Sequence, residues 1–178
     1  MSGKLTLLAF VLALAGYASG AEAFSQKVMN TCGSAEDLDA AIKACTQLID
    51  GKESRSTKVA AYFNRAWAYR TKGQPDLAIA DDTRAIELDP KAYRAFADRG
   101  AAYHDKDEYD LAIADATRSI ELNPKESVTY NNRGQAYRAK GDYDRAFADL
   151  NRAIELNPKN SHALYNRGTA HLDKTAYE

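Results

Sequence analysis

The chain has 178 residues, of which 45% are apolar and 28% charged, a composition typical of a globular protein rather than a disordered one. Its 24 basic and 25 acidic residues leave a formal net charge of -1. Without a basic excess the chain has no overall field to attract nucleic acid or an acidic membrane surface, so neither is expected as a partner.

Residues 1–23 have the features of a signal peptide. Lys4 provides a positive start, LTLLAFVLALA is an apolar core of suitable length, and AEA supplies a small-x-small cleavage site that ends at Ala23. The apolar run is short for a membrane span, which needs about 20 residues. We therefore expect export, cleavage before Phe24 and no membrane insertion after cleavage. The alternatives are an uncleaved anchor and a buried helix.

The sequence contains two cysteines, Cys32 and Cys45. In an exported protein, two cysteines with no other partner predict a disulfide. A zinc site or a redox dithiol would favour closely spaced pairs such as CxxC, and the sequence has none. Closing this loop is expected to stabilise the fold by about 3 kcal/mol and to staple a short terminal helix.

After the cysteines one motif appears three times: NRAWAYRTKGQPDLAIADDTRAIELDP, DRGAAYHDKDEYDLAIADATRSIELNP and NNRGQAYRAKGDYDRAFADLNRAIELNP. A fixed period of this length is typical of a repeat array. Three series of residues recur every 34 positions: Arg65, Arg99 and Arg133; Asp81, Asp115 and Asp149; Pro90, Pro124 and Pro158.

Each repeat contains two amphipathic helical patterns. In the first half of the third copy Tyr130, Gly134 and Tyr137 share one face, and the small central residue allows a second helix to approach closely. The second half repeats apolar residues at helical spacing from Tyr143 to Ile154. Neither helix can bury its apolar face alone, so the repeats are expected to stack. The turns between the two halves contain residues that tolerate a left-handed backbone, namely Gly73, Asp107 and Gly141.

This pattern resembles the tetratricopeptide repeat, which implies an all-α, right-handed α-solenoid of helix-turn-helix units. The signal peptide and the cysteines, with Asn64-Arg65, Asn132-Arg133-Gly134 and Asn166-Arg167-Gly168, resemble exported bacterial members with NRG-type repeats. The expected organisation is a capping region at 24–58, which includes a degenerate repeat helix at Asp37–Asp50, then full repeats at 59–92, 93–126 and 127–160, and a partial fourth repeat or terminal helix at 161–178. The alternative is that this last segment belongs to a longer array.

The resemblance implies that partners bind on the concave side, which is formed mainly by the first helices. The side chains expected there suit an extended peptide that has apolar anchors and acidic groups. The alternative for the single tryptophan, Trp67, is a packed position under the N-terminal cap. The expected groove residues are Phe63, Trp67, Arg70, Arg94, Ala101, His104, Val128, Asn131, Gln135 and Arg138.

Chaperone-binding members of this family hold a C-terminal carboxylate with Lys and Asn at set places. This chain has Phe63, Trp67, Asp98, Val128 and Asn132 at those places, so the chaperone function is not expected.

The arginine and aspartate series have two structural interpretations. Arg65, Arg99 and Arg133 could pair with Asp81, Asp115 and Asp149 across the helix seam, which would satisfy both charges. Alternatively each aspartate belongs to a solvated chain of ion pairs on its own helix, such as Asp81, Arg84 and Glu87.

No catalytic constellation is present, because His104, His162 and His171 are scattered and the carboxylates follow the repeat. The pair His162 and His171 lacks the i, i+4 spacing of a helical metal site. We therefore expect no enzyme activity, no metal and no cofactor. The predicted function is a periplasmic or secreted adaptor for a protein or peptide. The alternatives are a module that self-associates through its C-terminal edge and an accessory domain of a cell-envelope enzyme.

Overall fold

The computed structural model describes residues 26–177, so the predicted signal peptide lies outside the described part. Every regular element in this range is a helix, and the predicted all-α helical repeat solenoid is confirmed. Residues 26–32 are helical. The labelled helices that follow are α2 (Leu38–Asp50), α3 (Arg55–Thr71), α4 (Pro75–Leu88), α5 (Tyr93–Asp105), α6 (Tyr109–Leu122), α7 (Ser127–Ala139), α8 (Tyr143–Leu156) and α9 (Ser161–Tyr177).

The first helix of each repeat packs against the second, as α3 does with α4, α5 with α6 and α7 with α8. We call α3, α5, α7 and α9 the A helices and α2, α4, α6 and α8 the B helices. The chain reverses after α3, α5 and α7 through a residue with a left-handed backbone, as the sequence predicts. These residues are Gly73 (φ 70°), Asp107 (φ 61°) and Gly141 (φ 76°).

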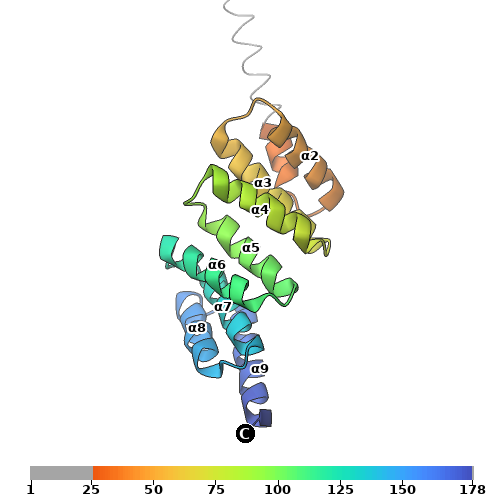
Figure 1. The fold of residues 1–178 in the computed structure, drawn as a ribbon. Coiled ribbons are helices and arrows are strands. Elements are labelled where there is room, and N and C mark those ends of the chain that lie inside the picture. The colour runs from red at the N-terminus through yellow and green to blue at the C-terminus, as the bar shows by residue number, and fades with distance from the viewer. Residues whose placement is uncertain (1–25, 178) are drawn as a thin grey trace, which may run out of the picture.

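The helices form one stack, with α2 near one end and α9 at the other (Figure 1). Each A helix also contacts the next A helix, whereas the B helices of the described chain make no such contacts with one another. The stack is therefore tighter on the A side and curves around it. We call the surface of the A helices that is turned away from the B helices the inner face.

The seams between A and B helices are filled by small side chains. Ala66, Ala78 and Ala102 are fully buried where α3, α4 and α5 meet, and Tyr69 and Ile79 pack against them. In the third repeat a Cβ on Gly134 would lie 2.9 Å from Leu150 Cγ, so the two backbones approach more closely than a larger residue allows. This packing is the physical reason for the small residue at the centre of α3, α5 and α7.

The N-terminal end of the stack is held by a disulfide. Cys32 is the last residue of the helical segment at 26–32, Cys45 lies on α2, and their sulfur atoms are bonded. Both are buried in a cluster with Leu48 and Ala61. Helix α2 begins after Asp37, whose carboxylate accepts hydrogen bonds from the backbone N–H groups of the first turn. The N-terminal segment is thereby fixed against α3.

We expect the double variant Cys32→Ser/Cys45→Ser to lower the free energy of unfolding by about 3 kcal/mol, because the unfolded chain regains the entropy of an open loop. Urea unfolding followed by circular dichroism measures the loss, and hydrogen exchange locates it in α2. Reductant should weaken the wild-type chain and leave the variant unaffected. Equal protection of the α2 amides in both proteins would contradict this prediction.

Candidate functional site

An open hollow of about 870 Å³ lies between the N-terminal halves of α3 and α5, beside the loop that follows α4. It includes two of the predicted groove residues, Phe63 and Arg94. Apolar side chains form most of its lining, among them Val59, Leu88 and Tyr93. The hollow is therefore suited to hold an apolar side chain.

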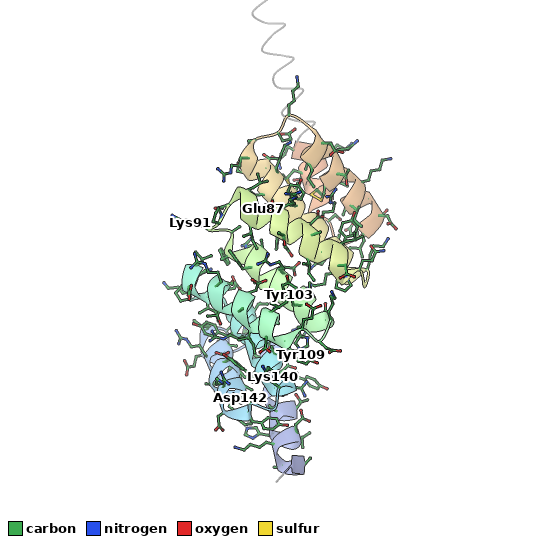
Figure 2. The ribbon with its side chains drawn as sticks, in the orientation of Figure 1. Glu87, Lys91, Tyr103, Tyr109, Lys140 and Asp142 are labelled. Carbon is green, nitrogen blue, oxygen red and sulfur yellow. A yellow bond between two sulfur atoms is a disulfide. The ribbon has the colours of Figure 1, made fainter. Side chains whose placement is uncertain are left out.

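Cations surround this hollow. Arg55, Lys91 and Arg94 all line it and are all exposed, and Asp89 is the one carboxylate among the lining residues. Figure 2 shows Lys91 on the loop between α4 and α5, pointing away from the ribbon. Arg94 Nε donates a hydrogen bond to the Tyr93 hydroxyl at 3.1 Å, which holds the guanidinium at the rim. The rim attracts negative charge, whereas the lining favours apolar groups.

Sequence reasoning missed Arg55 and Lys91. Both lie at or just outside helix ends, where the repeat pattern carries no information about which side chains face a hollow. The available signal was their position in the sequence: Arg55 lies shortly before Phe63, and Lys91 lies shortly before Arg94.

Further along the A helices, two of the predicted groove residues, Arg70 and Arg138, form ion pairs with carboxylates. Arg70 Nε donates to Asp98 at 3.0 Å, and its Nη1 donates to Asp105 at 3.5 Å. Arg138 Nη1 donates to Asp173 at 2.5 Å. Because these ion pairs join successive A helices, the two arginines hold the inner face together.

The other predicted groove residues differ in accessibility. Trp67, His104 and Gln135 are partly buried. Burial lowers the pKa of His104, against the opposing effect of the Asp105 carboxylate, so the ring favours its neutral form. Ala101 is also partly buried, whereas Val128 is 54% exposed.

Asn131 does not fit the predicted groove. It is only 5% exposed, and its side-chain oxygen accepts a hydrogen bond from Asn166 Nδ2 at 2.8 Å. Helix α9 packs against α7 and covers this position. The expectation that Asn131 faces a peptide is corrected, because its side chain is buried between α7 and α9.

The recurring arginines pair with the recurring aspartates across the seam. In the third repeat Arg133 Nε and Nη2 donate to the two carboxylate oxygens of Asp149 at 2.7 and 2.8 Å. Arg133 Nη1 donates to Thr117 of the preceding B helix at 3.0 Å. Each arginine therefore ties its own A helix to the B helices on both sides. The same arrangement joins Arg65 to Asp81 and Thr46, and Arg99 to Asp115 and Thr83.

The solvated ion pairs are a separate set. Arg84 pairs with Glu87 at 2.6 Å on the outer side of α4, without Asp81. Equivalent exposed pairs join Arg118 to Glu121 and Arg152 to Glu155. Both interpretations of the charge pattern thus describe part of the structure, with the aspartates in the seam and the glutamates in solvent.

Residues 26–177 lack two structural features. No three His, Cys, Asp or Glu side chains there are grouped as a metal site would require. None of the helices in this range combines the length and the apolar character that a membrane crossing needs.

The fold and the site define a helical repeat protein whose A helices present a curved surface, the kind of surface on which such proteins bind partners. Family models described as "Tetratricopeptide repeat" match residues 59–92, 93–126 and 127–160. The chain therefore belongs to the tetratricopeptide repeat family.

Solved structures with the same fold include the first repeat domain of Spaghetti (RPAP3) bound to the HSP90 peptide SRMEEVD. That domain is 26% identical with a TM-score of 0.63, and the match covers 66% of this chain and 95% of that one. A crystal structure of MamA is 26% identical with a TM-score of 0.67, covering 78% of this chain and 80% of that one. A tetratricopeptide repeat protein from Parabacteroides merdae ATCC 43184 is 18% identical with a TM-score of 0.69, covering 86% and 61% respectively. No curated protein sequence matches the chain.

Proposed function

We propose that this protein binds an extended segment of a partner protein and acts as an adaptor without catalysis. The observation that carries the proposal is the hollow between α3 and α5, with its apolar lining and the exposed cations Arg55, Lys91 and Arg94. An apolar side chain of the ligand enters the hollow, and acidic residues beside it meet the rim. The related domain that binds SRMEEVD supports a peptide as the type of ligand.

The expected location is the periplasm or the exterior of the cell. The disulfide between Cys32 and Cys45 supports it, because such bonds persist in oxidising compartments. The signal peptide expected at residues 1–23 points the same way. Partners would then be envelope or secreted proteins.

The proposal predicts which peptides the chain selects. Random linear peptides displayed on phage are panned on the wild-type protein, and enriched sequences are expected to contain a large apolar residue flanked by Asp or Glu. The variant Lys91→Glu/Arg94→Glu should weaken their binding by about tenfold or more, because it reverses two charges at the rim. Fluorescence anisotropy with the enriched peptides measures the change.

The repeat provides a matched control. Lys125 and Lys159 occupy the places of Lys91 in the next two repeats, are also exposed and lie outside the hollow. The variant Lys125→Glu/Lys159→Glu changes the net charge by the same amount and should bind the peptides like the wild type. If both variants lose the same affinity for the peptides, the effect comes from overall charge and the proposal is wrong. Enrichment of peptides without acidic residues would also contradict it.

A further inference from the structure

Two buried carboxyl groups on neighbouring helices have oxygens without hydrogen-bond partners. Asp82 on α4 is fully buried, and neither of its oxygens is bonded within the described chain. Asp98 on α5 is 8% exposed, and its Oδ2 is buried and unbonded as well. Burial raises the pKa of Asp82 to about 10, and the nearby Asp98 carboxylate adds to the effect. Asp82 therefore keeps its proton at neutral pH, and its hydroxyl group is a buried donor without an acceptor.

Two of the other charged groups that act on Asp82 are already engaged elsewhere. Arg99 directs Nε and Nη2 to Asp115 at 2.7 and 2.8 Å. Asp81 accepts two hydrogen bonds of similar length from Arg65. The acceptor that remains is the unpaired oxygen on α5, and a hydrogen bond to it would satisfy both buried groups.

The arginine that binds Asp98 is held less firmly than the arginines of the seams. Arg70 donates one hydrogen bond to Asp98, from Nε at 3.0 Å, and one of 3.5 Å to Asp105, whose side chain is 43% exposed. The side chain of Arg70 is 28% exposed. Arg133 is 18% exposed and donates two bonds of 2.7 and 2.8 Å to a single carboxylate. Exchange of partners therefore costs less at Arg70 than at an arginine of the seams.

Arg70 is also within reach of a segment that occupies the hollow. It stands seven residues after Phe63 on α3, which is about 10 Å along the helix axis. Three residues of an extended chain span about the same distance. An acidic side chain three positions from an apolar residue in the hollow would therefore arrive at Arg70.

We propose that Arg70 leaves Asp98 to bind an acidic side chain of the partner segment, and that the hydroxyl group of Asp82 takes its place at Asp98. No proton enters or leaves the protein in this exchange. The ligand carboxylate gains the guanidinium, and Asp98 replaces an N–H donor by an O–H donor. Arg70 thus touches the ligand, whereas Asp82 is a positioning residue that acts through Asp98. The inference rests on the proposed function, because the hollow has to hold the segment.

Two capped synthetic peptides test the exchange. In the first, a phenylalanine is flanked by aspartates and a glutamate follows it by three positions. In the second, glutamine replaces that glutamate. Fluorescence anisotropy with labelled peptides measures their affinities for the full chain, and the glutamate peptide is expected to bind about tenfold more tightly. Arg70→Gln should remove this preference.

Position 82 provides a matched pair of variants. Asp82→Ala removes the hydroxyl donor, and the fold should accept it because Ala116 occupies the same place in the second repeat, which circular dichroism checks. This variant should lose the preference for the glutamate peptide, since Arg70 then has to stay at Asp98. Asp82→Asn should restore the preference, because its amide N–H can bond to Asp98. A merely structural role of Asp82 would affect both peptides alike.

A change at the other carboxylate tests the order of the steps. Asp98→Asn weakens the hold on Arg70, so it should raise the affinity for the glutamate peptide several-fold. Addition of Asp82→Ala to this variant should have no further effect, because no charge at position 98 then needs a substitute donor.

The outcomes separate this inference from the proposed function. If neither peptide binds, the hollow does not hold such a segment, and the proposed function and this inference are both wrong. If both peptides bind with equal affinity, the hollow works without Arg70 and only the inference is wrong. A preference for glutamate that persists in Asp82→Ala would also overturn it, because Arg70 would then leave Asp98 without any replacement.

Discussion

Replacing Asp149 by alanine is expected to lower the free energy of unfolding by about 3–5 kcal/mol, because it leaves the charge of Arg133 without its partner inside the seam. The side chain of Arg133 is 18% exposed, and both of its bonds to Asp149 are lost together. Thr117 and the rings of Tyr130 and Tyr137 remain beside the guanidinium, but none of them carries a charge to balance it.

The double variant Arg133→Leu/Asp149→Ala should recover most of this loss. With both charges gone the seam becomes apolar, and exchange of a buried ion pair for apolar side chains is often close to neutral. Arg133→Leu alone should lower the free energy of unfolding by about as much as Asp149→Ala, because it leaves the buried carboxylate without its partner. Urea unfolding followed by circular dichroism gives the four values of the cycle.

An exposed ion pair supplies the control for this cycle. Glu155→Gln breaks the pair with Arg152, whose side chain is 47% exposed, and should change stability by less than about 0.5 kcal/mol. If the losses from Arg133→Leu and Asp149→Ala simply add in the double variant, the two side chains do not stabilise the seam as a pair.

The repeated features of this molecule could be predicted from the sequence. The period placed a turn at Gly73, Asp107 and Gly141, and the structure has a left-handed residue at each. The arginine and aspartate series share one period, so a contact between them in one repeat is expected in every repeat. The pair Arg133 and Asp149 therefore predicts the pairs in the other two repeats. The period did not reveal the threonines that complete each cluster, because they belong to the preceding repeat.

The features that occur once could not be predicted from the repeat period. The hollow between α3 and α5 depends on Lys91 and Arg55, which lie outside the periodic helix faces. Asn131 is buried because α9 covers it, and the repeat pattern of α7 alone does not indicate that cover. Asp82 departs from the pattern altogether, since Ala116 and Leu150 occupy its place in the later repeats.

Asp82→Asn is expected to stabilise the protein by about 1–3 kcal/mol at pH 8, because a neutral amide folds without the proton that the buried carboxyl group must take up. Asp82 is fully buried, and neither of its oxygens is bonded within the described chain. Burial raises its pKa to about 10, and the neighbouring Asp98 carboxylate adds to the effect while Arg99 opposes it. The folded chain therefore keeps a proton that the unfolded chain releases near the ordinary pKa of 3.8.

The direction of the pH dependence follows from that proton. Between pH 4 and pH 10 the folded state binds more protons at Asp82 than the unfolded state, so this group's contribution to stability declines as pH rises. The advantage of Asp82→Asn should accordingly be larger at pH 8 than at pH 5. His104 has a lowered pKa and acts in the opposite direction, but it is present in both proteins and cancels in their difference.

The adjacent aspartate makes the comparison decisive. Asp81→Asn is the same chemical change one residue away, yet it removes the carboxylate that Arg65 holds at 2.7 and 2.8 Å. It should destabilise the chain at both pH values, whereas Asp82→Asn stabilises it. Urea unfolding of the three proteins at pH 5 and pH 8 measures both effects. A gain from Asp82→Asn that is the same at the two pH values would mean that the buried carboxyl group does not hold its proton, and that the Asp82 side chain reaches water when the chain is folded.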